Sequence, residues 1–174
     1  MFKKNSIIAK KYSTRARSVQ PRILSFIAVF FLIYSLAGCQ SAPPLPPVNL
    51  SVPGWTVRQG QAVWRAKKEA PEITGEVLAA TNPDGRGFVQ FTITPFPLIV
   101  AQTASNSWQI HDVRANRTFT AWGNPPARVV WLQLPRCLSG AAPTGGWQWQ
   151  RSGDGQFQLR NSRSGETLEG FLNP

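Results

Sequence analysis

The chain has 174 residues and a formal net charge of +11, from 19 Lys and Arg against 8 Asp and Glu. Seven of the basic residues and none of the acidic residues precede residue 39, so the remainder has 12 basic against 8 acidic residues. These 12 are scattered along the chain except for Arg65, Lys67 and Lys68, whereas nucleic-acid binding needs a clustered basic face, so this class of function is excluded.

Residues 1–38 have the pattern of an export signal. A basic segment precedes an apolar run over residues 23–37, which at about 15 residues is too short for a comfortable membrane span. The run ends in Leu36-Ala37-Gly38-Cys39, which resembles the lipobox of bacterial lipoproteins. That resemblance implies cleavage between Gly38 and Cys39 and a lipid on the Cys39 thiol; the alternative is a signal anchor that is never cleaved.

Residues 39–53 are expected to form an acylated cysteine and a proline-rich tether. Five prolines and no charged residue fall between residues 40 and 53, which is typical of an extended polyproline segment. At about 3.1 Å per residue, such a tether would hold the domain some 30 to 40 Å from its lipid. A motif for a proline-recognising partner is the alternative. Among bacterial lipoproteins, Gln40 in place of aspartate after the cysteine implies delivery to the outer membrane.

The remaining residues, 54–174, are expected to form one domain of strands with alternating polarity, separated by turn residues. The clearest strand alternates apolar Val89, Phe91 and Ile93 with polar residues, as a half-buried strand requires. The fold class is therefore mainly β: a curved antiparallel sheet or incomplete β-barrel. Its strands, about nine in number, are predicted at residues 62–66, 73–81, 86–94, 98–102, 107–112, 117–122, 147–151, 156–160 and 166–172.

One short helix is predicted against the sheet, over residues 125–134. Pro125 suits the first helical turn, and Pro135 is expected to end the helix. The buried face of this helix would carry Val130, Leu134 and Cys137. Because Cys137 has no partner if Cys39 carries a lipid, we expect it to be a buried free thiol.

The sequence offers little for catalysis, and we expect no enzyme activity, metal site or cofactor. The single histidine, His111, lies on the more polar face of its predicted strand and lacks the partners that zinc needs. The carboxylates are spread along the chain without a recognisable pair, and no phosphate loop or nucleophile elbow is present.

Aromatic residues are in excess in the domain, with six tryptophans after residue 60. Most are expected to be core, and the rest to line an apolar cavity between the curved sheet and the helix. Our candidates for this cavity are Trp64, Phe91, Trp108, Phe119, Trp131 and Trp149.

The order of these elements resembles the half-barrel of the lipoprotein-localisation carrier and receptor superfamily. The resemblance covers residues 61–172 and is carried by Pro97-Leu98, the Gly123-Asn124 turn, the Trp131-Leu132 and Leu134-Pro135 pairs, and the strand that starts at Gly146-Trp147. It implies an outer-membrane lipoprotein facing the periplasm that binds a lipid or the acyl chain of a lipoprotein. Phe96-Pro97-Leu98 is the nearest counterpart of the receptor's protruding apolar loop.

Two other functions fit the same pattern. The first is a structural or assembly lipoprotein that holds an envelope protein through a sheet edge or an aromatic patch. The second is a peptidoglycan or glycan binder that uses Trp147 and Trp149. All three hypotheses place the protein in the cell envelope, attached to a membrane through Cys39, and all three expect binding rather than bond-making.

Overall fold

The computed structural model describes residues 42–173, which belong to one compact unit. The predicted signal segment, the cleavage site at Gly38, Cys39 and Gln40 lie outside these residues. Within them, nine strands form one antiparallel sheet that does not close, and one helix packs against it. The predicted fold class, a mainly β, curved open sheet with one short helix, is confirmed.

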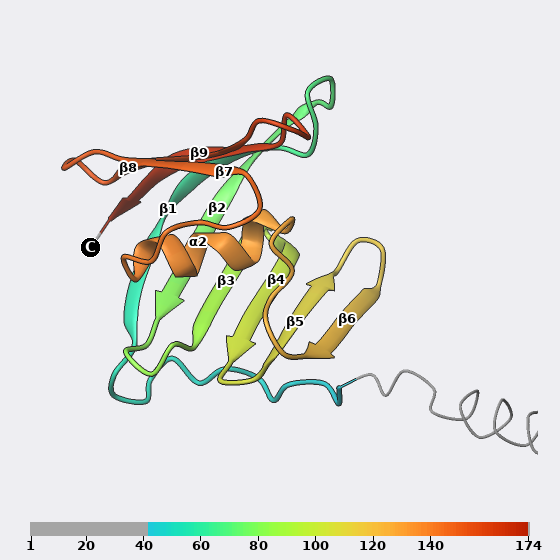
Figure 1. Cartoon of the computed structure of the whole chain (residues 1–174), viewed down its shortest axis with the longest axis vertical. Coiled ribbons are helices and arrows are strands. Elements are labelled where there is room, and N and C mark those ends of the chain that lie inside the picture. The colour runs from blue at the N-terminus through green and yellow to red at the C-terminus, as the bar shows by residue number, and fades with distance from the viewer. Residues whose placement is uncertain (1–41, 174) are drawn as a thin grey trace, which may run out of the picture. The chain divides into compact units, whose positions relative to one another are not determined.

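The strand order across the sheet is β6-β5-β4-β3-β2-β1-β9-β8-β7 (Figure 1). Eight strands lie within two residues of their predicted bounds. β1 begins six residues earlier than predicted. The prediction missed this part of the strand because its inward positions include Arg58 and Gly60, which give no apolar alternation. The strands are β1 (Thr56–Arg65), β2 (Glu72–Thr81), β3 (Gly87–Ile93), β4 (Phe96–Ala104), β5 (Ser107–Asp112), β6 (Arg117–Trp122), β7 (Trp147–Arg151), β8 (Gln156–Asn161) and β9 (Thr167–Asn173).

The sheet turns sharply between β1 and β9. In Figure 1, β7, β8 and β9 run above the helix, β2 to β4 lie behind it, and β5 and β6 lie to its right. Two glycines permit this turn. A Cβ atom on Gly60 would collide with the carbonyl oxygen of Phe171, and one on Gly170 would collide with the carbonyl oxygen of Gln61. Glycine in a strand commonly marks such a close approach of backbones.

The helix α2 (Val130–Leu138) packs on β2, β3 and β4. The predicted bounds, 125–134, were wrong: Val129 still has extended backbone, and Pro135 lies inside the helix. Pro135 is tolerated because its ring packs on β3 beside Gly87, where an added Cβ would lie 2.6 Å from the Pro135 Cβ. In so short a helix, it removes a single backbone hydrogen bond. The expected buried face is confirmed for Val130, Leu134 and Cys137.

The described part of the tether, residues 42–53, contains no helix or strand and runs along the sheet (Figure 1). The backbone N–H of Leu45 donates to Gln109 Oε1 at 2.7 Å, and Thr120 Oγ1 donates to the carbonyl oxygen of Ala42 at 2.6 Å. The expected separation of 30 to 40 Å is therefore wrong, because polar side chains of β5 and β6 bind the tether's backbone from its first described residue.

Replacing Gly170 by Ala should lower the free energy of unfolding by about 1–3 kcal/mol, because the added methyl group forces β1 and β9 apart. Urea unfolding followed by tryptophan fluorescence measures this change. Gly153→Ala is the matched control: nothing lies within 4 Å of the added atom, so the expected change is below about 0.5 kcal/mol. Equal losses in the two variants would contradict the close approach of the strands.

Candidate functional site

The six aromatic candidates all lie on the concave side of the sheet. Strand register places Trp64, Phe91, Trp108, Phe119 and Trp149 on the face that α2 covers in part, and Trp131 belongs to α2 itself. Period-two alternation had indicated a common face within each strand, and the sheet brings these faces together.

Three of the six form the packed contact between helix and sheet. The Trp131 ring centroid lies 5.0 Å from that of Phe91 and 5.2 Å from that of Trp64. Phe91 and Trp131 are buried, while Trp64 is partly buried. These contacts make Phe91 and Trp131 core residues with no open surface for a ligand.

The two tryptophans of β7 are also engaged in packing. Trp147 is buried, and its Nε1–H donates to the carbonyl oxygen of Ala127 at 2.8 Å. Trp149 is partly buried, with its ring centroid 6.0 Å from that of Phe157. The pair that the sequence suggested for sugar stacking therefore faces the protein interior.

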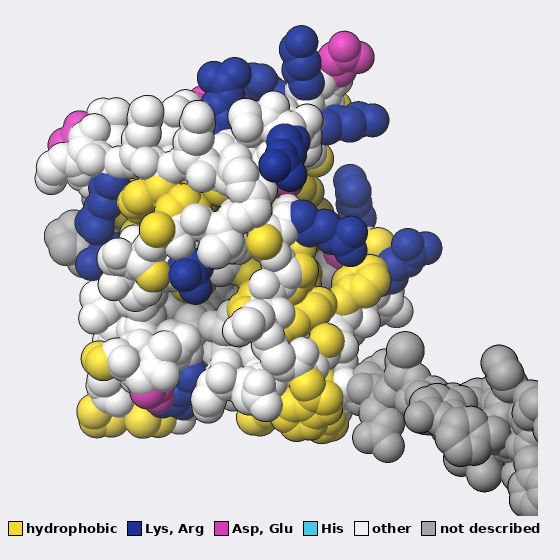
Figure 2. All heavy atoms as spheres, viewed as in Figure 1, with side chains coloured by type: hydrophobic (Ala, Val, Ile, Leu, Met, Phe, Trp, Pro, Cys, Tyr) yellow, Lys and Arg dark blue, Asp and Glu magenta, His cyan; other side chains and the backbone are white. Residues whose placement is uncertain are grey.

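Beyond α2, the concave face is exposed mainly at β6, because the segment from β6 to α2 passes in front of β4 and β5 in Figure 1. There, Ile110 and Phe119 are directly opposite each other in the register, and Trp108 lies two residues away on the same face. Trp108 and Ile110 are partly buried, and the Phe119 side chain is 53 % exposed. We call these three residues the aromatic shelf; Figure 2 shows hydrophobic side chains at the surface in this region.

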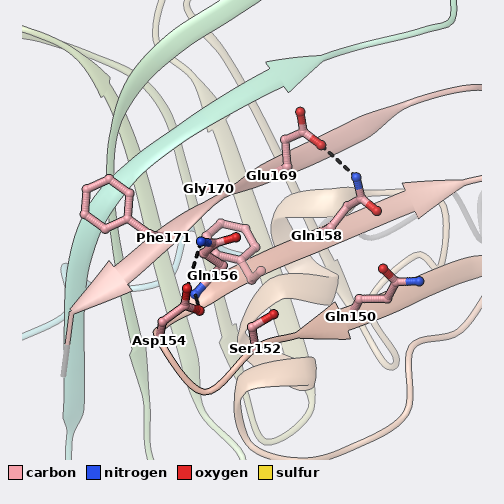
Figure 3. Close-up of a pocket in the computed structure, with 9 residues that line it drawn as sticks. Gln150, Ser152, Asp154, Gln156, Gln158, Glu169, Gly170 and Phe171 are labelled. Carbon is pink, nitrogen blue, oxygen red and sulfur yellow. Dashed lines mark hydrogen bonds between the residues drawn. The ribbon is translucent and has the colours of Figure 1, made fainter.

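The convex face carries a polar hollow of about 610 Å³ over β7, β8 and β9 (Figure 3). Gln158 Nε2 donates to Glu169 Oε2 at 2.7 Å, and Gln156 Nε2 donates to Asp154 Oδ2 at 2.8 Å. Phe171, 41 % exposed, contributes an apolar ring to the same hollow. Its lining consists mainly of amide, hydroxyl and carboxylate groups: Gln150, Ser152, Asp154, Gln156, Gln158 and Glu169.

Basic residues that are scattered in the sequence meet at one end of the sheet, which Figure 2 shows at the upper right. In an antiparallel sheet of this order, the β1–β2, β5–β6 and β8–β9 turns fall at the same end. A cavity of about 460 Å³ there is lined by Arg65, Lys68, Arg160 and Arg163. The sequence places basic residues in every second turn of the strand series, and such turns fall at the same end of an antiparallel sheet. This spacing is the signal that could have predicted the cluster.

Within residues 42–173, no three His, Cys, Asp or Glu side chains are placed to hold a metal ion. His111 is half-buried in β5, on the face with Ser107 and Gln109, as alternation predicted. Burial raises the pKa of Glu166, an effect that the hydrogen bond from Trp64 Nε1 partly offsets.

Comparison with known proteins gives no family. No protein-family model matches the chain, and no curated protein matches its sequence. Over residues 42–173, no helix has the length and apolar character needed to cross a membrane. The functional assignment therefore rests on the residues and geometry described above.

Cys137 should be unreactive in the folded protein. Burial raises the pKa of this thiol to about 11, an effect that the neighbouring Arg136 charge partly offsets, so the thiolate is scarce at pH 8. Labelling with an aromatic disulfide reagent should be negligible in buffer and complete in urea. The raised pKa also means that the thiol's contribution to stability is complete below pH 9 and is lost as the pH rises toward 11. Rapid labelling of the folded protein at pH 8 would contradict this burial.

Proposed function

We propose that the protein is an envelope lipoprotein, held on the outer membrane by a lipid on Cys39, that binds an acyl chain or a similar apolar ligand on the aromatic shelf. The observation that carries this proposal is the partial cover of the concave face. Trp131 fills the centre of that face, whereas Phe119 on β6 is exposed and its neighbours Trp108 and Ile110 on β5 are only partly buried.

The chemistry of the shelf suits an amphipathic ligand. Burying a methylene group against apolar side chains contributes about 0.8 kcal/mol, so a chain of several methylenes on the shelf would bind without any polar contact. Arg117 lies two residues from Phe119 on the same face, opposite Asp112 in the register, and forms no ion pair with residues 42–173. Its guanidinium is available to a carboxylate or phosphate at the end of an acyl chain.

An open half-barrel with a helix on its concave side is also the arrangement that the resemblance to the carrier and receptor superfamily implies. The acyl chains of other lipoproteins belong to the proposed ligand class, so a part in lipoprotein localisation follows from the same site. In this proposal, the protein binds its ligand and breaks no bond.

The soluble form, residues 40–174 exported behind a signal without a lipobox, should carry a stoichiometric apolar ligand. Native mass spectrometry with solvent extraction detects it. Trp108→Ala should reduce occupancy about tenfold, because it removes the largest ring of the shelf. Phe171→Ala, on the opposite face, is the control and should leave occupancy unchanged.

An empty domain that also fails to take up an added fatty acid would contradict ligand binding. That result would favour the assembly lipoprotein, which holds an envelope protein through a sheet edge.

The polar hollow favours a second candidate function, binding of a glycan such as peptidoglycan. Its amides and carboxylates supply donors and acceptors, and Phe171 supplies an exposed ring, the mixture that sugar hydroxyls and ring faces need. Retention of the soluble form on cell-wall sacculi tests this function. Phe171→Ala combined with Gln158→Ala should release the protein, whereas Trp108→Ala should not; retention that survives both changes would exclude the hollow.

A further inference from the structure

Only a few residues separate the proposed lipid on Cys39 from the residue of the tether that contacts β6. Thr120, in the middle of β6, donates its hydroxyl hydrogen to the carbonyl oxygen of Ala42 at 2.6 Å. Two residues separate Cys39 from Ala42. Three peptide units can span at most about 11 Å, because consecutive Cα atoms are about 3.8 Å apart. A lipid on Cys39 therefore keeps β6 near the bilayer.

β6 is an edge strand with aromatic residues exposed on both of its faces. Phe119, on the concave face, is 53 % exposed, and Trp122, on the convex face, is 56 % exposed. Over residues 42–173, one other large apolar side chain is more than half exposed, that of Phe96 in the β3–β4 hairpin. An apolar edge strand in water is prone to aggregation, whereas aromatic rings are favoured at a membrane–water interface.

Positive charge lies at one end of β6, beside Phe119 and at the opposite end of the strand from Trp122. Arg114, in the β5–β6 turn, and Arg117, the first residue of β6, are exposed and form no ion pair within the described residues. Each basic residue near an anionic bilayer surface strengthens binding about fivefold at physiological ionic strength. Aromatic and basic side chains together are the pattern of a surface that lies in the membrane interface.

We infer that β6 is a second membrane contact, which lies on a bilayer that contains anionic phospholipid. Phe119 and Trp122 enter the boundary between headgroups and acyl chains, and Arg114 and Arg117 contact the phosphates. The inference rests on the proposed lipid on Cys39 for the nearness of the bilayer. Because Phe119 also belongs to the aromatic shelf, the shelf opens on the bilayer, and an acyl chain can reach it without crossing water.

Vesicle sedimentation with the soluble form tests the contact without the lipid anchor. The vesicles contain phosphatidylcholine with 30 % phosphatidylglycerol, and a second set contains phosphatidylcholine alone. Binding should fall about tenfold in Trp122→Ser and about 25-fold in the double variant R114Q/R117Q, and it should fall by a factor similar to the second without the anionic lipid. Phe171→Ser is the matched control, an exposed aromatic on β9 away from β6, and should bind as the unchanged protein does. Phe96→Ser tests the β3–β4 hairpin, the other place where the resemblance suggests an apolar contact.

The inference would be overturned if Trp122→Ser bound as the unchanged protein does, or if the unchanged soluble form did not bind. Loss of binding in Phe96→Ser alone would place the contact at the β3–β4 hairpin and would overturn it as well. The amount of apolar ligand bound to the aromatic shelf is measured on the same preparations. It distinguishes failure of the membrane contact from failure of the proposed ligand binding. Trp122 lies on the face opposite the shelf, so its replacement should leave the bound ligand in place.

Discussion

The close approach of β1 and β9 is the constraint on which the rest of the domain depends. Gly60 and Gly170 each face the opposite backbone where a Cβ atom would collide with a carbonyl oxygen. Because both positions lack side chains, the sheet bends sharply there, and β9, β8 and β7 continue it along another side of the helix (Figure 1). The resulting hollow accepts Trp131, which packs between Phe91 and Trp64.

The length of α2 determines where the concave face stays open. Its nine residues cover β2, β3 and β4, which leaves the face of β5 and β6 to the aromatic shelf. On the other side of the same strands, the tether binds Gln109 and Thr120, and its first described residue, Ala42, contacts β6. The aromatic shelf and the proposed membrane contact thus share one edge of the sheet. α2 does not extend over this edge on the concave side, and the tether binds to it on the convex side.

Local chemistry predicted most of the strands, because a two-residue period and turn-forming residues are readable without tertiary contacts. β5 and β6 have the predicted bounds, and the aromatic candidates do share the concave side. What local chemistry could not show depends on partners distant in sequence. Pro135 stays helical because Gly87 leaves room for its ring, and β1 begins early because β2 and β9 pair with it on both sides.

The docking of the tether and the clustering of basic residues at one end of the sheet also depend on contacts between residues that are distant in sequence. No short segment of the sequence predicts that Gln109 accepts the hydrogen bond of the Leu45 N–H. Nor does any short segment predict that Lys68 and Arg163 line the same cavity. The six aromatics could be placed on one face from their spacing, but which of them α2 would cover depended on where the helix crosses the sheet. Burial of Phe91 beside exposure of Phe119 is therefore a tertiary outcome.

Photo-crosslinking in intact cells would decide whether the shelf is a lipid site. Cells fed a fatty acid with a diazirine near its terminal methyl group incorporate it into their lipids, and irradiation followed by peptide mass spectrometry locates the crosslinked residues. We predict crosslinks on the concave face of β5 and β6, at Trp108, Ile110 and Phe119. Because Phe119 and Trp122 are also proposed to contact the bilayer, crosslinks confined to these two residues or to the lipid on Cys39, with none at Trp108 or Ile110, would contradict binding on the shelf.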